Sequence, residues 1–242
     1  MKRSHRSITL AESSEIRSRR PDPDGNRTSS VAFITYGERL NQRCSTNYDQ
    51  RSFRDLVQKA LQAGAIIVNI LQEDARGRGA RPAKWIESLL RTELEKAWTT
   101  YNVRTIGSVM SFFSTSDVTL ESEEALDPDI GLQSHMLTFR APTGLLCIIN
   151  ASLPTFPRTT RQRLLNCYAD AAAKYNADHI LIGGASHNSV VFMENQVSQL
   201  NLDFEFFSLK DLYLLAHAAD KNPLRCYDLD SSEPYSLVRL GL

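Results

Sequence analysis

The chain has 242 residues and equal numbers of basic and acidic side chains, 28 Lys or Arg against 28 Asp or Glu, so its formal net charge is zero. Apolar residues make up 42% and charged residues 23%, values that exclude a collagen-like, coiled-coil or wholly disordered chain. No long uncharged apolar run occurs, so the sequence predicts neither a transmembrane helix nor a membrane partner.

The beginning of the chain differs from the rest in composition. Residues 1–30 contain seven Lys or Arg against four Asp or Glu, which gives this segment a charge of +3 and leaves −3 for the remainder. Few apolar residues occur in it, as is typical of disordered segments. We therefore predict a disordered basic tail over residues 1–29, solvated rather than a nuclear-import signal, and one domain over residues 30–242.

From residue 31 onward, a periodicity typical of strands alternates with one typical of helices. Near-continuous apolar runs rich in Ile and Val predict strands that are covered on both faces. The predicted strands span 31–36, 65–73, 104–114, 135–140, 145–153, 179–184, 203–207 and 235–240. Apolar residues at i, i+3 and i+4 predict helices over 51–64, 83–98, 160–175, 193–200 and 209–218.

Two further segments complete the predicted organisation. The acidic stretch 117–131 has neither periodicity and is predicted to be irregular. Pro142 and Gly144 form a turn signal between 135–140 and 145–153, which predicts a hairpin. Helices that alternate with apolar strands, together with one hairpin, predict an α/β domain with a mixed sheet.

The cysteines carry no recognisable site. All four are scattered without CxxC spacing, which argues against a zinc site or a disulfide framework and predicts an intracellular protein, nuclear or cytoplasmic. Cys147 lies in an apolar strand and Cys167 on a predicted helix, so we expect both to be buried structural thiols.

Polar or flexible residues follow three of the predicted strands, within 69–73, 150–154 and 183–189. In open α/β sheets, ligands bind at the carboxyl ends of the strands. These three segments are therefore the candidate positions for a functional site.

The order of the segments resembles the metal-dependent endonuclease/exonuclease/phosphatase superfamily over residues 31–240. The best matches are ILQE at 70–73 and the stretch from IINASLP through RTTRQRLLNCYADAAAKYNADHILIGG. The superfamily has a strand ending in QE, a later strand ending in a His-Leu step, an Arg-bearing stretch, a helix, a strand ending in GGDFN and a closing SDH-P step. The resemblance implies a two-sheet β-sandwich flanked by helices, with a Mg²⁺- or Mn²⁺-dependent phosphoesterase or nuclease site.

Most of the superfamily's chemical residues are replaced in this chain. Its metal-binding Glu is matched by Glu73, and Pro234 of the closing step is kept. The positions of the Asn, His, Asp, Asn, Asp and His fall in that order on Gly37, Ser152, Ala185, His187, Ser232 and Glu233. Since a hard cation needs several oxygen ligands and each acid–base group supplies about 10²–10⁴-fold in rate, these losses predict absent or severely weakened catalysis.

Three functional hypotheses follow. The first is a catalytically degenerate relative that keeps the scaffold to bind a partner protein or nucleic acid. The second is a divergent Mg²⁺- or Mn²⁺-dependent phosphodiesterase or nuclease, with Glu73 as metal ligand and His187 and Glu233 as catalytic groups; this set would also suit Zn²⁺. The third is a nucleotide-binding domain in which a loop at Gly183 and Gly184 cradles a phosphate.

Candidate substrate-binding residues lie around the same strand ends. Ser152, Ser186 and Asn188 carry hydroxyl or amide groups there. The loop after Glu73 contains Arg76, Arg78 and Arg81, which could contact phosphates. Nucleic-acid binding would use this loop and the basic tail, whereas the acidic domain favours a protein partner.

Overall fold

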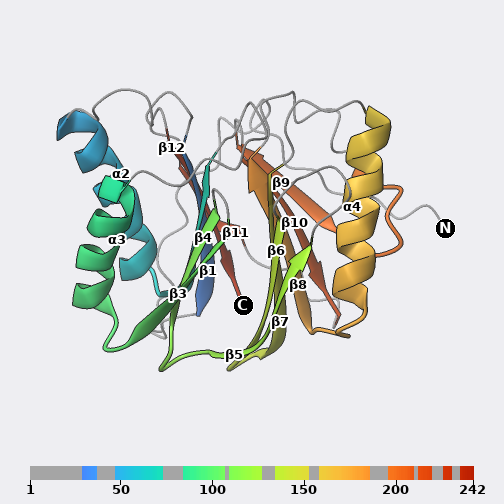
Figure 1. Cartoon of the computed structure of the whole chain (residues 1–242), viewed down its shortest axis with the longest axis horizontal. Coiled ribbons are helices and arrows are strands. Elements are labelled where there is room, and N and C mark those ends of the chain that lie inside the picture. The colour runs from blue at the N-terminus through green and yellow to red at the C-terminus, as the bar shows by residue number, and fades with distance from the viewer. Residues whose placement is uncertain are drawn as a thin grey trace.

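The structure is a computed structural model that describes residues 29–36, 47–72, 84–106, 109–126, 134–152, 158–185, 196–209, 212–219, 226–230 and 235–242. Two six-stranded sheets pack face to face, and helices cover their outer faces (Figure 1). The two-sheet sandwich flanked by helices that the sequence predicted is confirmed.

The first sheet has the strand order β11-β12-β1-β2-β4-β3. Its members are β11 (Cys226–Asp230), β12 (Tyr235–Gly241), β1 (Ser30–Tyr36), β2 (Ala65–Gln72), β4 (Val109–Ser114) and β3 (Tyr101–Ile106). β1 and β2 are parallel and are connected through α2 (Asn47–Gln62), which packs on the outer face together with α3 (Lys84–Ala97). Gly64 adopts a φ of 85° just after α2, so it ends the helix as predicted.

The second sheet has the order β5-β6-β7-β8-β10-β9. Its members are β5 (Thr119–Leu126), β6 (Ser134–Ala141), β7 (Gly144–Ser152), β8 (His179–Ala185), β10 (Leu212–Ala218) and β9 (Glu205–Leu209). β7 and β8 are parallel, and their crossover is α4 (Arg158–Ala173) on the outer face. Each sheet therefore contains one β-α-β unit at its centre.

Three apolar cores hold the layers together. The central core lies between the sheets and includes Phe33, Leu71 and Phe139. A second core joins α4 to the second sheet, and a third joins α2 and α3 to the first sheet. Because both faces of each sheet are covered, the central strands are the continuous apolar runs that the sequence displays.

Two predicted elements are wrong. The segment 209–218 was predicted to be a helix, but it contains the end of β9 and the whole of β10. Leu214 of β10 packs between the sheets and Leu215 packs under α4, so apolar residues on both faces imitate a helical pattern. The acidic segment 117–131 was predicted to be irregular, yet 119–126 is the edge strand β5, whose carboxylates lie on its exposed positions.

Smaller differences concern strand division and burial. The predicted strand over 104–114 belongs to two antiparallel strands, β3 and β4. Cys167 is exposed on α4, so the prediction of a buried thiol fails there. Cys147 is buried as predicted, and burial raises the pKa of its thiol to about 12. The helix predicted over 193–200 lies partly outside the described residues. The tail predicted over 1–29 lies outside them except for Ser29.

None of the described helices is long and apolar enough to cross a membrane.

Candidate functional site

In the first sheet, β1, β2 and β12 each have one end at the same edge of the sandwich. The parallel register of β1 and β2 pairs Tyr36 with Gln72, the last residue of each strand. The antiparallel register of β1 and β12 pairs Tyr36 with Tyr235, the first residue of β12. Two strands therefore end, and a third begins, in one row.

The second sheet has an equivalent row. The parallel register of β7 and β8 pairs Ser152 with Ala185, again the last residue of each strand. Leu212, the first residue of β10, pairs with Ala185 from the other side. The strands of this sheet therefore end and begin at one row as well.

Contacts between the sheets show that the two rows lie at the same end. Asn69 of β2 accepts a hydrogen bond from Asn150 Nδ2 of β7 at 3.0 Å, and both residues lie two or three positions before the ends of their strands. Phe33 of β1 lies against Gly183 of β8. We name this end the convergent edge and define it by Tyr36, Gln72, Ser152, Ala185 and Tyr235.

Most of the predicted site residues lie just past these strand ends and outside the described residues. Glu73 follows Gln72, His187 lies two residues after Ala185, and Glu233 lies two residues before Tyr235. The others in this position are Arg76, Arg78, Arg81, Ser186 and Asn188. The structure therefore brings together the strand ends next to which these residues lie in the chain. Of the predicted site residues, it describes the backbone of Ser152.

The two glycines of the proposed phosphate loop are strand residues, at the end of the strand that the sequence predicts over 179–184. Both lie within β8 and pair with β7 and β10. A Cβ on Gly183 would lie 2.5 Å from the ring of Phe33, and one on Gly184 would overlap the carbonyl oxygen of Ala151 and the hydroxyl of Tyr213. These glycines therefore permit close packing, and they do not form an anion cradle.

A buried polar cluster lies directly beneath the convergent edge. Asn69, Ser111 and Asn150 are fully buried between the sheets. The Ser111 hydroxyl donates to Asn69 Oδ1 at 2.9 Å, and Asn150 Nδ2 lies 3.0 Å from Asn69 Oδ1 and 2.8 Å from Ser111 Oγ. Asn69 and Asn150 belong to the polar segments 69–73 and 150–154 that the sequence singles out, whereas their contact with Ser111 was not predicted. Each of the three is a polar interruption at an inward position of an apolar strand.

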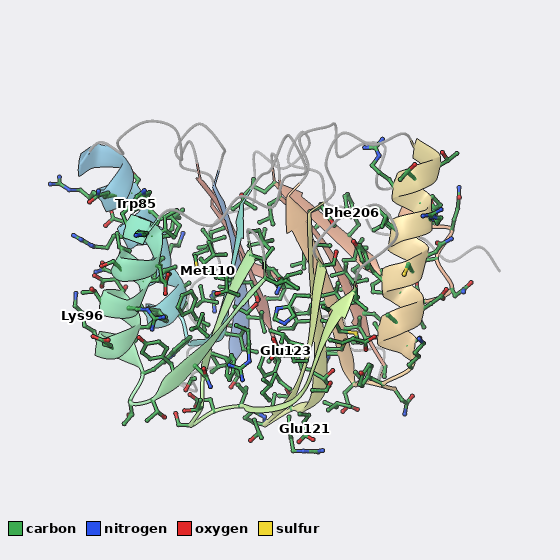
Figure 2. All side chains as sticks on the ribbon, viewed as in Figure 1. Trp85, Lys96, Met110, Glu121, Glu123 and Phe206 are labelled. Atoms are coloured by element: carbon green, nitrogen blue, oxygen red, sulfur yellow. The ribbon has the colours of Figure 1, made fainter. Side chains whose placement is uncertain are left out.

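Beside this cluster, a charged group joins the edge strands of the two sheets. Glu123 of β5 accepts hydrogen bonds from Arg104 of β3 at 2.7 Å and from His135 Nε2 of β6 at 2.9 Å. Figure 2 shows Glu123 toward the space between the sheets, whereas Glu121 lies at the bottom of the view. His135 is only 2% exposed, and this burial lowers the pKa of its imidazole below the ordinary value of 6.5, against the opposing effect of Glu123.

The stability of the domain should therefore decrease as the pH falls through the titration of His135. Its pKa is lower in the folded than in the unfolded state, so the unfolded state binds more protons below about pH 6.5. We expect the urea midpoint to be lower at pH 5.5 than at pH 7.5. His135→Gln, which keeps a donor for Glu123, should weaken this dependence. An equal slope in His135→Gln and the unmodified protein would contradict the assignment.

Outside the convergent edge, a groove of about 600 Å³ runs between α4 and the end of β5. Glu124, Cys167 and Lys174 are among its lining residues, and none of the predicted site residues is. Within the described residues, no group of three His, Cys, Asp or Glu side chains is close enough to hold a metal ion.

No protein-family model matches the chain, and no curated protein matches it in sequence. Solved structures match it in fold. A humanized TDP2 from D. rerio superimposes with a TM-score of 0.57 at 9% identity, covering 87% of this chain and 98% of that one. The human Nocturnin catalytic domain gives 0.56 at 11% identity, covering 88% and 94%.

A third similar structure carries the name of the superfamily. An endonuclease/exonuclease/phosphatase family protein from Bacteroides thetaiotaomicron gives a TM-score of 0.50 at 9% identity, covering 88% of this chain and 98% of that one. The chain therefore has the endonuclease/exonuclease/phosphatase fold, and the fold expected from the sequence resemblance is confirmed.

Proposed function

We propose that this chain, which has the endonuclease/exonuclease/phosphatase fold, is a non-hydrolytic binding protein that uses its scaffold to hold a protein partner. One observation carries the proposal. Ser152 and Ala185 are paired neighbours at the ends of the central parallel strands β7 and β8. They occupy the positions at which the superfamily resemblance implies a His and an Asp.

The chemistry of these two residue types explains the inference. Hydrolysis of a phosphodiester needs an activated water and stabilisation of the charge that develops on the phosphoryl oxygens. An alanine side chain neither accepts a proton nor binds a cation, and a serine hydroxyl is a weak substitute for an imidazole. A divalent metal therefore does not fit the donors offered at this part of the convergent edge, and we derive no catalytic step through one.

The charge of the domain favours protein over nucleic acid as the partner. Residues 31–242 carry a net charge of −3, because the first 30 residues carry +3 and the whole chain carries zero. Affinity for nucleic acid depends mainly on basic groups that neutralise phosphates. An acidic domain therefore suits a protein partner with a basic surface.

A second candidate function, the divergent phosphodiesterase, rests on the register of the first sheet. Gln72, Tyr36 and Tyr235 form one row across β2, β1 and β12, so the end of β2 that precedes Glu73 in the chain and the start of β12 that follows Glu233 lie about two strand spacings apart, roughly 10 Å. One or two carboxylates, together with waters, usually hold Mg²⁺ in a protein. A solved TDP2 from D. rerio, one of the structurally similar proteins, holds a single-strand DNA product.

A cleavage assay separates the two candidates. Full-length protein is incubated with labelled single- and double-stranded DNA and RNA and Mg²⁺ or Mn²⁺, beside Glu73→Ala and the matched control Glu121→Ala on exposed β5. We expect all three proteins to remain at the buffer background while circular dichroism shows intact folding. Cleavage by the unmodified protein and Glu121→Ala, but not by Glu73→Ala, would establish the phosphodiesterase instead.

A further inference from the structure

Arg161 on α4 is a buried cation with two unpartnered nitrogen atoms. Its exposed fraction is 8%, and neither its Nε nor its Nη1 atom has a hydrogen-bond partner. No ion pair joins it to a carboxylate within the part of the chain that the structure describes. Charged groups removed from water are normally paired, and the described residues offer this guanidinium no counter-charge.

The geometry of α4 places Arg161 near the convergent edge. Arg161, Leu165 and Tyr168 share one face of the helix, the face that packs on the second sheet. Tyr168 contacts Ser134, the first residue of β6, through their hydroxyls at 2.5 Å. Because α4 is the crossover from the end of β7 to the start of β8, its first turn lies at the convergent edge, and Arg161 lies two turns closer to it than Tyr168.

The helix terminus adds a second positive feature at the same place. α4 has 16 residues and no acidic residue in its first turn. The first four N–H groups of a helix have no acceptor within it, and together they carry a partial positive charge. A cationic side chain is disfavoured there, whereas an anion is favoured. One oxyanion would satisfy both the helix terminus and the guanidinium.

We propose that Arg161 and the first turn of α4 bind the phosphate group of a small ligand, free phosphate or a nucleotide. The planar guanidinium matches two phosphate oxygens at once, and the helical N–H groups supply further donors. The site goes beyond the proposed function, because it requires neither a metal ion nor hydrolysis and uses none of the residues of the cleavage assay.

Ligand titration of the full-length protein tests the site. The melting temperature is followed against inorganic phosphate and, separately, adenosine 5′-monophosphate, with chloride keeping the ionic strength constant and no metal present. We expect a saturable rise, with about 10- to 100-fold weaker apparent affinity in Arg161→Gln. Arg163→Gln, an exposed arginine of the same helix, should behave like the unmodified protein. A response to the nucleotide at concentrations where phosphate has none would identify the nucleotide as the ligand.

A second measurement keeps the proposal testable if ligand affinity is low. Because an unpaired buried charge opposes folding, Arg161→Met should melt at the same or a higher temperature than the unmodified protein without phosphate, and at a lower one in saturating phosphate. Absence of a saturable response in the unmodified protein overturns the proposal. So does equal weakening in Arg163→Gln, or loss of folding of Arg161→Met without phosphate, which would assign Arg161 to protein contacts. Cleavage in the nuclease assay would leave these results unchanged.

Discussion

Gly184→Ala is expected to lower the free energy of unfolding by about 3 kcal/mol, at the upper end of the cost of overpacking a core. The added methyl would overlap the carbonyl oxygen of Ala151 and the hydroxyl of Tyr213. The Ala151 oxygen belongs to the backbone of the neighbouring strand, so it cannot rotate away. Denaturant unfolding followed by the fluorescence of Trp85 and Trp98 gives the change in free energy.

Gly183 supplies the matched control. The three atoms nearest to a methyl at Gly183 all belong to the ring of Phe33, which is a side chain and can be replaced. Gly183→Ala should therefore be largely rescued by Phe33→Leu, whereas Gly184→Ala should not be rescued by Tyr213→Phe. Full rescue by Tyr213→Phe would contradict this explanation. It would show that the Tyr213 hydroxyl, and not the close approach of the Ala151 backbone, requires a glycine at position 184.

Asn69→Ala should cost about 3 kcal/mol of stability, although it removes only a small polar side chain. Asn69 Oδ1 accepts from Ser111 and Asn150, and its amide lies 3.4 Å from the Ala32 carbonyl oxygen. Truncation removes the acceptor of the buried Ser111 hydroxyl and one of the two acceptors of the Asn150 amide, at about 1–3 kcal/mol, and opens a cavity between the sheets. Chemical denaturation at neutral pH measures the loss.

Replacement of the whole cluster distinguishes this explanation from simple loss of packing. The triple variant Asn69→Leu, Ser111→Ala, Asn150→Leu removes every polar group at once and should be more stable than Asn69→Ala. Asn166→Ala on the exposed face of α4 should change the stability by less than about 0.5 kcal/mol. A triple variant as unstable as the single one would show that volume, and not the orphaned donors, sets the cost.

The central strands and the helices could be predicted because burial on both faces leaves continuous apolar runs. β1, β2 and β8 are such runs, and α3 begins and ends within one residue of its prediction. The sequence of β10 does not distinguish a strand from a helix, because the residues from Leu212 to Leu215 are all apolar or aromatic and are buried on both faces of the sheet. β5 was missed because an edge strand needs few apolar residues, and its pairing with β6 is a long-range contact that no local pattern records.

The site was predictable only in its position. Strand ends rich in polar residues indicated where Ser152 and Ala185 would lie, and the register pairs them. The roles of Asn69, Asn150 and Arg161 were not predictable, because each depends on which groups surround a buried side chain. The glycines of β8 lie in the strand predicted for them, but their packing role was not predictable for the same reason: a glycine that admits a neighbouring side chain and a glycine that lines a phosphate loop have the same letter in a sequence.

The position of β12 has a consequence for how the chain folds during synthesis. β12 pairs along its whole length with β1, the first strand, and the backbone N–H of Leu242 donates to the carbonyl of Ser29 at 2.9 Å. The strands of the second sheet lie together in the chain, from β5 to β10, so that sheet can pair before β12 has been synthesised. The first sheet must wait with one side of β1 unpaired. Until then, the unpaired edge of β1 exposes backbone N–H and C=O groups that can pair with a wrong strand. Pairing with β12 covers this edge.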